Sequence, residues 1–327
     1  MTDTPSAKRQ RLETHADDTG EIRSKYWFDD GNVVLQAEKT QFRVHRSMLA
    51  YHSNVFKDMF SLPQPEQPSE PCVDGCPVVE MSDKAGDVEY VISIFYENIR
   101  TNDMRALMSF EHLAAILRLG KKYEIDHLRD EGLRRLRREF PMTLKLWDEA
   151  IEKDMEISRS LFCCEDIINL AHELSIHTVL PAAYTLYSAN YSSENMLDYE
   201  SGRTQLNQRA LKGCLIGREM LFRKAHEAFK EWLNHGLDFI IPGPSCTSPE
   251  NCKASKFLAL DHIPAMDFSD GQMDILFELK ESFTRSICLK CRRSIIAAYD
   301  KVREELWQSL PTLFGLPNWE DLRDFDA

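Results

Sequence analysis

The stretch FRVHRSMLAYHSNVFKDMF, residues 42–60, decides the fold of the N-terminal part of the chain. It reads as the end of a half-buried strand, at Phe42 and Val44, followed by two short helices whose apolar residues recur at helical spacing. Ser53 stands where the second helix should begin, because its hydroxyl can accept a hydrogen bond from a free amide of the first turn. The stretch therefore predicts a strand, a corner and two consecutive helices.

The residues before this stretch predict a β-hairpin. In YWFDDGNVVLQAEKTQFRVH, residues 26–45, Trp27 and Phe28 come before a turn at 30–32. A strand follows in which Val33, Leu35 and Ala37 alternate with other residues. A polar turn at 38–40 then leads back into the strand at Phe42.

The residues after it predict a surface loop, a strand and three helices. Prolines are too dense between Ser61 and Pro77 for a helix or a central strand, so this segment should be a loop. Residues 77–81 predict a short strand. The apolar residues of the first helix are Val88, Val91, Ile92, Phe95 and Ile99. Residues 110–140 predict two more helices, with a break near Gly120.

This order of elements resembles the BTB/POZ family, and within it the fungal, basidiomycete-type proteins that carry a helical C-terminal extension. The resemblance implies an α+β domain, a short sheet covered by helices, at residues 22–140, followed by a mostly α-helical region. The family's core motif is matched by Phe42, His45, Arg46, Met48, Tyr51 and Phe56, most of which should be buried, and the fold-defining set is completed by Leu49, Ser53, Val55, Met59 and Phe60. We expect His45 to be a hydrogen-bonded histidine at the corner between strand and helix.

The resemblance also implies function. BTB domains associate with one another or bind other proteins. The resemblance therefore implies a homodimer, a hetero-oligomer or a substrate adaptor for a cullin-type ubiquitin ligase. Cullin-binding members carry a hydrophobic-x-Glu turn after the second core helix, whereas this chain has Leu62 and then Gln64, with Glu66 out of step. The alternative is a nuclear cofactor of transcription regulators.

Composition narrows the classes of function. The chain has 327 residues, a formal net charge of −13 and no apolar N-terminal run, so we expect an intracellular protein of the cytoplasm or nucleus without a membrane span. The acidic charge argues against direct nucleic-acid binding. No catalytic motif is present, which disfavours a thiol- or metal-dependent enzyme. Residues 1–21 predict a disordered tail, in which Lys8, Arg9 and Arg11 resemble a nuclear import signal or form a solvated basic cluster.

Residues 141–235 predict a helical, BACK-like extension, with helices over 144–155 and 163–189. Pro181 suits the first turn of a helix, and Cys163 and Cys164 suit buried positions. The sequence HELSIH places His172 and His177 five residues apart, too far around a helix to share one metal ion, so both should be solvated or capping. The basic run at 134–138 predicts a solvated face, or else a surface for a partner or a second import signal.

Residues 236–327 predict a further helical region that contains the strongest candidate site. Cys246 and Cys252 lie in a turn-rich loop, and Cys288 and Cys291 form a CxxC pair. Four thiolates are the ligand set of structural zinc, which would join the loop at 242–254 to a helix beginning near Gln272. Basic residues beside both pairs would lower the thiolate pKa values.

Two other interpretations of these cysteines stay open. They could be ordinary reduced cysteines, or a redox dithiol or disulfide. A second CxxxC pair, Cys72 and Cys76, lacks further ligands nearby in the sequence, and we expect it to bind no metal.

Overall fold

The computed structural model describes seven ranges and four further residues of the chain. They are residues 20–62, 71–97, 107–152, 164–198, 204–231, 241–260 and 286–325, together with residues 157, 276, 278 and 279. The chain divides into two compact units between Gly132 and Leu133. Within these ranges, no helix combines the length and the apolar character needed to cross a bilayer.

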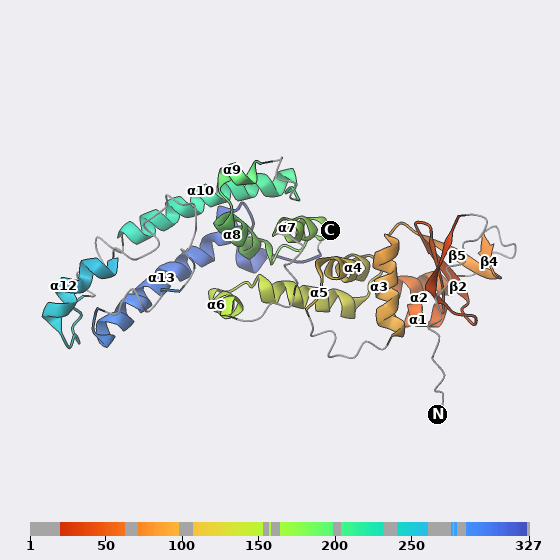
Figure 1. Ribbon diagram of the computed structural model, residues 1–327, viewed down its shortest axis with the longest axis horizontal. Coiled ribbons are helices and arrows are strands. Elements are labelled where there is room, and N and C mark those ends of the chain that lie inside the picture. The colour runs from red at the N-terminus through yellow and green to blue at the C-terminus, as the bar shows by residue number, and fades with distance from the viewer. Residues whose placement is uncertain are drawn as a thin grey trace, which may run out of the picture. The chain divides into compact units, whose positions relative to one another are not determined.

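The N-terminal unit contains a small sheet and helices (Figure 1), which confirms the predicted fold of this part. Its elements are β1 (Ile22–Trp27), β2 (Val33–Ala37), β3 (Thr40–Val44), α1 (Arg46–His52), α2 (Asn54–Ser61), β4 (Cys72–Val73), β5 (Cys76–Met81), α3 (Ala85–Tyr96), α4 (Phe110–Lys122) and the first part of α5 (Asp126–Glu139). The strands are arranged in the order β1-β3-β2-β5-β4.

The predicted hairpin is formed by β2 and β3, which pair antiparallel with Leu35 opposite Phe42. The sequence predicted an alternation of Val33, Leu35 and Ala37 with other residues in β2, but Val33, Val34 and Leu35 are all at most 1% exposed. The reason is that β2 is the central strand: Val34 packs on the face where Val78 lies, and Trp27 covers this cluster. β1 pairs parallel with β3, so the turn at 30–32 connects two strands that are not paired with each other.

Strand β4 was not predicted, because it lies inside the segment interpreted as a proline-rich loop. It pairs antiparallel with β5 across a tight turn at Asp74 and Gly75, whose φ angles are 48° and 76°. Asp-Gly is the sequence signal of such a turn, since both central residues need positive φ. The Asp-Gly dipeptide therefore predicts this turn, although the many prolines of the segment favour a loop.

Helices α3 and α4 pack against each other, and α4 ends two residues later than the predicted break near Gly120. Gly120 has a different role. A Cβ atom there would lie 2.9 Å from the backbone nitrogen of Arg129, so the glycine allows α4 and α5 to approach closely. The chain turns instead at Glu124, which has a φ of 50°.

The C-terminal unit is helical in its described residues, as predicted. Its elements are the rest of α5, α6 (Leu144–Glu152), α7 (Cys164–Leu174), α8 (Leu180–Asn190), α9 (Ser193–Met196), α10 (Gln208–Glu231), α12 (Pro249–Leu260), α13 (Leu289–Leu313) and the 3-10 turn η6 (Trp319–Asp321). The long helices α10 and α13 lie side by side, and α7 and α8 pack together near the C-terminal end of α13 (Figure 1). Pro181 lies in the first turn of α8, as predicted.

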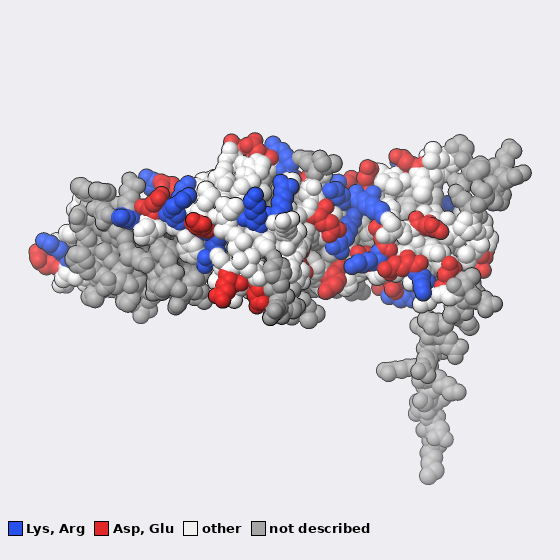
Figure 2. Space-filling view, turned by 90° about the horizontal axis from the view of Figure 1, so that it is seen from above, with Lys and Arg blue, Asp and Glu red and all other residues white. Residues whose placement is uncertain are grey.

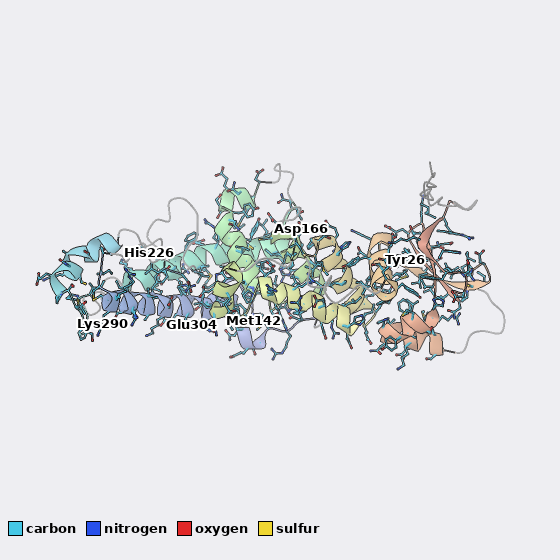
Figure 3. All side chains as sticks on the ribbon, turned by 60° about the horizontal axis from the view of Figure 1, so that its bottom comes forward. Tyr26, Met142, Asp166, His226, Lys290 and Glu304 are labelled. Atoms are coloured by element: carbon cyan, nitrogen blue, oxygen red, sulfur yellow. The ribbon has the colours of Figure 1, made fainter. Side chains whose placement is uncertain are left out.

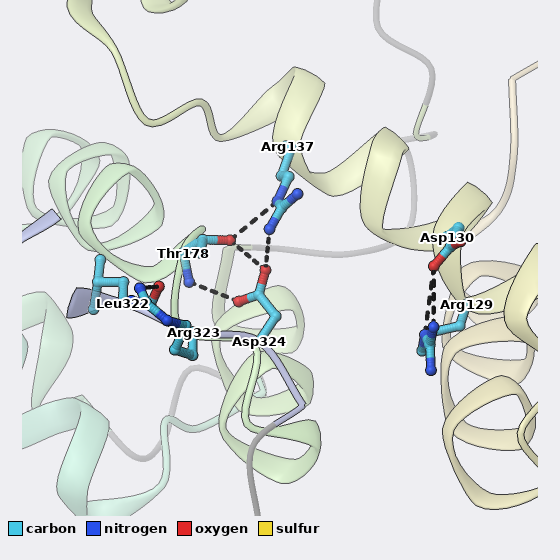
Figure 4. Close-up of polar contacts among 7 residues, drawn as sticks. All are labelled: Arg129, Asp130, Arg137, Thr178, Leu322, Arg323 and Asp324. Carbon is cyan, nitrogen blue, oxygen red and sulfur yellow. Dashed lines mark hydrogen bonds and ion pairs between the residues drawn. The ribbon is translucent and has the colours of Figure 1, made fainter. Parts of the chain in front are cut away.

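The residues after α13 return to the start of α8 (Figure 4). The carboxylate of Asp324 accepts hydrogen bonds from the backbone N–H and the hydroxyl of Thr178, at 2.9 and 2.6 Å. Arg137 completes the set with an ion pair to the same carboxylate at 2.7 Å, and the Asp324 side chain is 4% exposed. These contacts hold the residues that follow α13 against α5 and the start of α8.

Two predictions for this region were wrong. The last long helix begins at Leu289, whereas Gln272 lies outside the described residues, so the CxxC pair stands at the beginning of the helix and not within it. Arg135 is fully buried, although the basic run was predicted to be solvated. The neighbouring Arg134, Arg137 and Arg138 are exposed.

Candidate functional site

The four cysteines predicted as a zinc site converge. The sulfur atoms of Cys246, Cys252, Cys288 and Cys291 all lie within 4.8 Å of one another. A zinc ion with four sulfur ligands at about 2.3 Å in tetrahedral geometry sets the sulfurs about 3.8 Å apart. The Cys246 and Cys288 sulfurs are 3.8 Å apart, so the observed spacing suits zinc.

Local backbone structure places each of these sulfurs. Cys246 ends a tight turn in which its N–H donates to the carbonyl of Gly243 at 3.0 Å. Cys252 lies near the start of α12, and Cys288 directly precedes α13, with Cys291 in its first turn. Figure 3 labels Lys290, between the last two cysteines, where α13 begins beside α12. Two helix N-termini thus face the sulfurs, and their dipoles favour negative charge there.

The cluster is partly enclosed. Cys252 is 0% and Cys291 1% exposed, while Cys246 and Cys288 are half-buried. The backbone N–H of Cys288 donates to the sulfur of Cys252 at 3.3 Å. Because N–H to sulfur hydrogen bonds favour a thiolate, this contact supports the charged form of a ligand.

Protonation differs among the thiols in the absence of a metal. Interactions with the backbone amides of Cys291 and Thr247 lower the pKa of Cys288 to about 5. Burial raises the pKa of Cys291 to about 12 and also raises the pKa of Cys252. A metal ion would therefore have to displace protons from the buried thiols, which makes its binding depend on pH.

The chemistry of this donor set is that of a closed site. Four thiolates fill a tetrahedral shell and leave no position for water or substrate, so an ion held here would be structural. The flanking Lys253 and Lys290 are exposed and would offset the negative charge of the complex. By contrast, Cys72 is exposed, while Cys76 is buried and donates to the carbonyl of Gly31 at 3.2 Å.

The N-terminal motif forms a hydrogen-bonded corner around Ser53 and His45. The Ser53 hydroxyl accepts from the N–H of Phe56 at 3.1 Å and donates to the carbonyl of Tyr123 at 2.5 Å, as a cap of α2. His45 Nδ1 lies 3.1 Å from the Tyr96 hydroxyl, and its Nε2 lies 3.2 Å from a carboxylate oxygen of Asp30. His45 is therefore the predicted hydrogen-bonded histidine between strand and helix.

The expected burial of the motif was correct in part. Phe42, Leu49, Ser53 and Phe56 are at most 4% exposed. The others are half-buried except Tyr51, which is 83% exposed and therefore contributes no core packing. Tyr51 lies at the end of α1, where its ring meets the edge of the neighbouring His52, with ring centroids 5.0 Å apart.

These residues belong to the segment that the comparison with protein families recognises. Residues 25–138 match the family model of the BTB/POZ domain. This segment is a BTB domain. No curated protein matches the chain. The BTB domain is a protein-interaction fold, and the residues on its surface are therefore candidates for partner contacts.

Several predicted residues of the BTB region and the tail lie outside the described part of the chain. They are Gln64 and Glu66 of the turn compared with cullin-binding members, and Lys8, Arg9 and Arg11 of the basic cluster. His172, on the other hand, was predicted to be solvated or capping, and this was wrong. It is half-buried in the C-terminal unit, with its Nε2 2.5 Å from the Tyr184 hydroxyl.

Proposed function

We propose that the protein is a scaffold that assembles through its BTB domain, as a homodimer or with a protein partner. The observation that supports this proposal best is the match of residues 25–138 to a protein-interaction domain. Tyr51 adds to it, because a large aromatic side chain that is 83% exposed is typical of a contact surface. Tyr51 would therefore be a central contact of the interface.

The test is the mass of the purified full-length protein by size-exclusion chromatography with light scattering. We expect a dimer, and we expect Tyr51→Ala to shift it towards monomer. Leu197→Ala is the matched control, since Leu197 is also an exposed apolar residue, at 49%, and lies in the C-terminal unit. A wild-type monomer would contradict self-association.

A cullin is the hetero-partner that we propose. Support comes from the helical region after the BTB domain, which substrate adaptors of cullin-type ligases also carry. Adding a purified cullin N-terminal region to the same column should give a complex of the summed mass. Restoring the expected acid with Gln64→Glu should strengthen that complex, whereas the same variant without any effect would argue against cullin binding.

A nuclear cofactor of transcription regulators is the alternative, and it is supported by the basic cluster at 8–11. A fluorescently tagged protein should then accumulate in the nucleus and lose this distribution when Lys8, Arg9 and Arg11 are replaced by alanine. Equal distribution of both proteins would count against this alternative.

We also propose that Cys246, Cys252, Cys288 and Cys291 hold one structural zinc ion. The four converging sulfurs support it. Elemental analysis on the chromatographic peak should give about one zinc per chain. Cys252→Ser should lower that content, whereas Cys72→Ser, at an exposed cysteine, should not. Metal-free protein purified under reducing conditions would contradict the proposal.

A redox or thiol-dependent site is the rival, because the Cys246 and Cys288 sulfurs are neighbours. Thiol titration of the native protein separates the two. A zinc-bound cluster should react slowly until a chelator is added. One fast-reacting thiol that is lost in Cys288→Ser would favour the rival.

A further inference from the structure

The C-terminal unit contains a pocket that neither the BTB domain nor the cysteine cluster explains. It has a volume of about 210 Å³. It opens between α7, α8, the start of α10 and the residues that follow α13. Its walls are formed by His172, Tyr184, Arg209, Lys212, Ile216 and Phe314, together with Leu316 and two glycines.

The mouth of this pocket carries two basic side chains. Arg209 and Lys212 stand three residues apart at the beginning of α10, on the same side of the helix, and both are exposed. No ion pair or side-chain hydrogen bond joins either of them to a residue that the structure describes. Cations at a helix N-terminus also oppose the helix dipole, so this placement costs stability in the absence of an anion.

The acid–base state of the pocket at neutral pH follows from its surroundings. Burial first, and then the charge of Arg209, lowers the pKa of His172 to about 4, so its ring is neutral at pH 7. Burial raises the pKa of Tyr184, so its hydroxyl stays protonated and in hydrogen-bond contact with His172. The charge of the pocket is therefore that of Arg209 and Lys212.

The floor of the pocket is apolar and firmly packed. Tyr184 is 2% and Phe314 4% exposed, and their rings lie 5.3 Å apart in a tilted arrangement. Ile216 is 48% exposed, which places an uncovered aliphatic side chain beside the two cations. An apolar group that displaced water from this floor would gain favourable burial.

Figure 2 looks onto the side of the C-terminal unit where α10 lies. It shows separate groups of basic side chains over that helix, divided by residues that are neither basic nor acidic. Basic groups therefore lie beside surface that carries no charged residue, with acidic groups also present, although the whole chain has a net charge of −13.

We propose that this pocket binds a carboxylate joined to an apolar group, with Arg209 and Lys212 holding the carboxylate and the Tyr184–Phe314 floor receiving the apolar group. Two sources share this chemistry. One is an acidic side chain beside a large apolar side chain in a peptide segment of a partner, and the other is a free aromatic or aliphatic acid. The proposal uses residues of the C-terminal unit alone and is independent of the proposed BTB scaffold and zinc site.

In the test, the binding of phenylacetate to the full-length protein is measured by ligand-observed NMR at low salt. We expect a dissociation constant on the order of millimolar, as is usual for so small a ligand. Acetate lacks the ring and benzyl alcohol lacks the charge, so both should bind clearly more weakly. Inorganic phosphate should not compete. A fluorescein-labelled Gly-Ser-Glu-Phe-Gly-Ser peptide, measured by anisotropy, represents the peptide source.

The decisive variant is Arg209→Ala combined with Lys212→Ala, which changes only exposed side chains. It should weaken phenylacetate by about tenfold or more. The matched control is Arg223→Ala combined with Lys230→Ala, which removes the same charge from exposed positions further along α10 and should leave binding unchanged. Ile216→Ser should weaken phenylacetate and leave the weak binding of acetate unaltered.

Three results would overturn the proposal. They are the absence of binding by both phenylacetate and the peptide up to about 20 mM, an equal loss in both double variants, and equal binding of phenylacetate and benzyl alcohol. If the pocket binds as proposed, tighter binding of the peptide than of phenylacetate points to a protein partner, and the reverse order points to a free acid.

Discussion

Gly217 of α10 lies against the ring of Phe314, so closely that a Cβ atom at position 217 would overlap the ring. Phe314 follows α13 and is 4% exposed, so its ring has little room to move aside. The absence of a side chain at one position of α10 thus allows the end of α13 to pack against it.

Gly217→Ala should destabilise the protein. Because the overlap with the buried Phe314 ring is severe, its cost should be about 2 to 3 kcal/mol, and the better helix propensity of alanine returns about 1 kcal/mol, so the net loss should be about 1 to 2 kcal/mol. Gly213→Ala is the control one turn earlier, where a Cβ atom would meet its nearest neighbour at 3.4 Å. It should be neutral or stabilising. Denaturant unfolding of the two variants would refute this packing if they changed stability equally.

Asp324→Asn should loosen the C-terminal segment. The substitution removes the charge that pairs with Arg137 and weakens the hydrogen bonds to Thr178, at a cost of about 1 to 3 kcal/mol. Asp321→Asn, at an exposed position close by, should have no measurable effect. Limited proteolysis, which reports local opening, should release the C-terminal residues faster only in the first variant.

Ser53→Ala should cost about 1 to 2 kcal/mol, because one hydroxyl both caps α2 and donates to the carbonyl of Tyr123. Ser109→Ala removes the cap of α4, where the hydroxyl accepts a longer bond of 3.3 Å from His112 in an exposed setting. Its cost should be smaller. The melting temperatures of the two variants measure how much the buried hydrogen bond from Ser53 to Tyr123 contributes to stability. A larger decrease in the Ser109→Ala variant would contradict this contribution.

His172 should make stability depend on pH. Its pKa is lowered to about 4 from an ordinary value of 6.5, so the unfolded chain takes up a proton between these values while the folded protein does not. Stability is therefore fully present above pH 6.5 and is lost as the pH falls towards 4, by about 2 kcal/mol after allowance for solvent screening. Thermal melts at pH 7 and 4.5 should show a smaller difference in His172→Gln than in the wild type.

Local signals in the sequence predicted much of the N-terminal unit. Ser53 sits between two short apolar patterns, and a capping serine acts on amides within three residues, so the sequence alone places it. Asp74 and Gly75 carried an equally local signal for the β4–β5 turn. The full burial of Val34 could not be read in this way, because it depends on which strands become its neighbours.

The four cysteines were predicted as one candidate zinc site, but the sequence does not give the contacts that bring them together. The CxxC pair predicted that Cys288 and Cys291 act together, but their meeting with Cys246 depends on how α12 and α13 pack. The pocket around Arg209 was not predicted at all, since His172, Arg209 and Phe314 are more than a hundred positions apart along the chain from first to last. The burial of Arg135 could not be predicted either, because its basic neighbours in the sequence are exposed and only the packing of the folded chain buries it.

The cysteine cluster brings together positions that are separated by the 35 residues between Cys252 and Cys288. A metal ion here would close that segment into a loop, and the entropy of closing a loop grows only slowly with its length. Insertions or deletions between the end of α12 and Cys288 should thus cost little loop entropy, provided that the four thiols remain, so this part of the chain should vary in length during evolution more freely than α12 and α13.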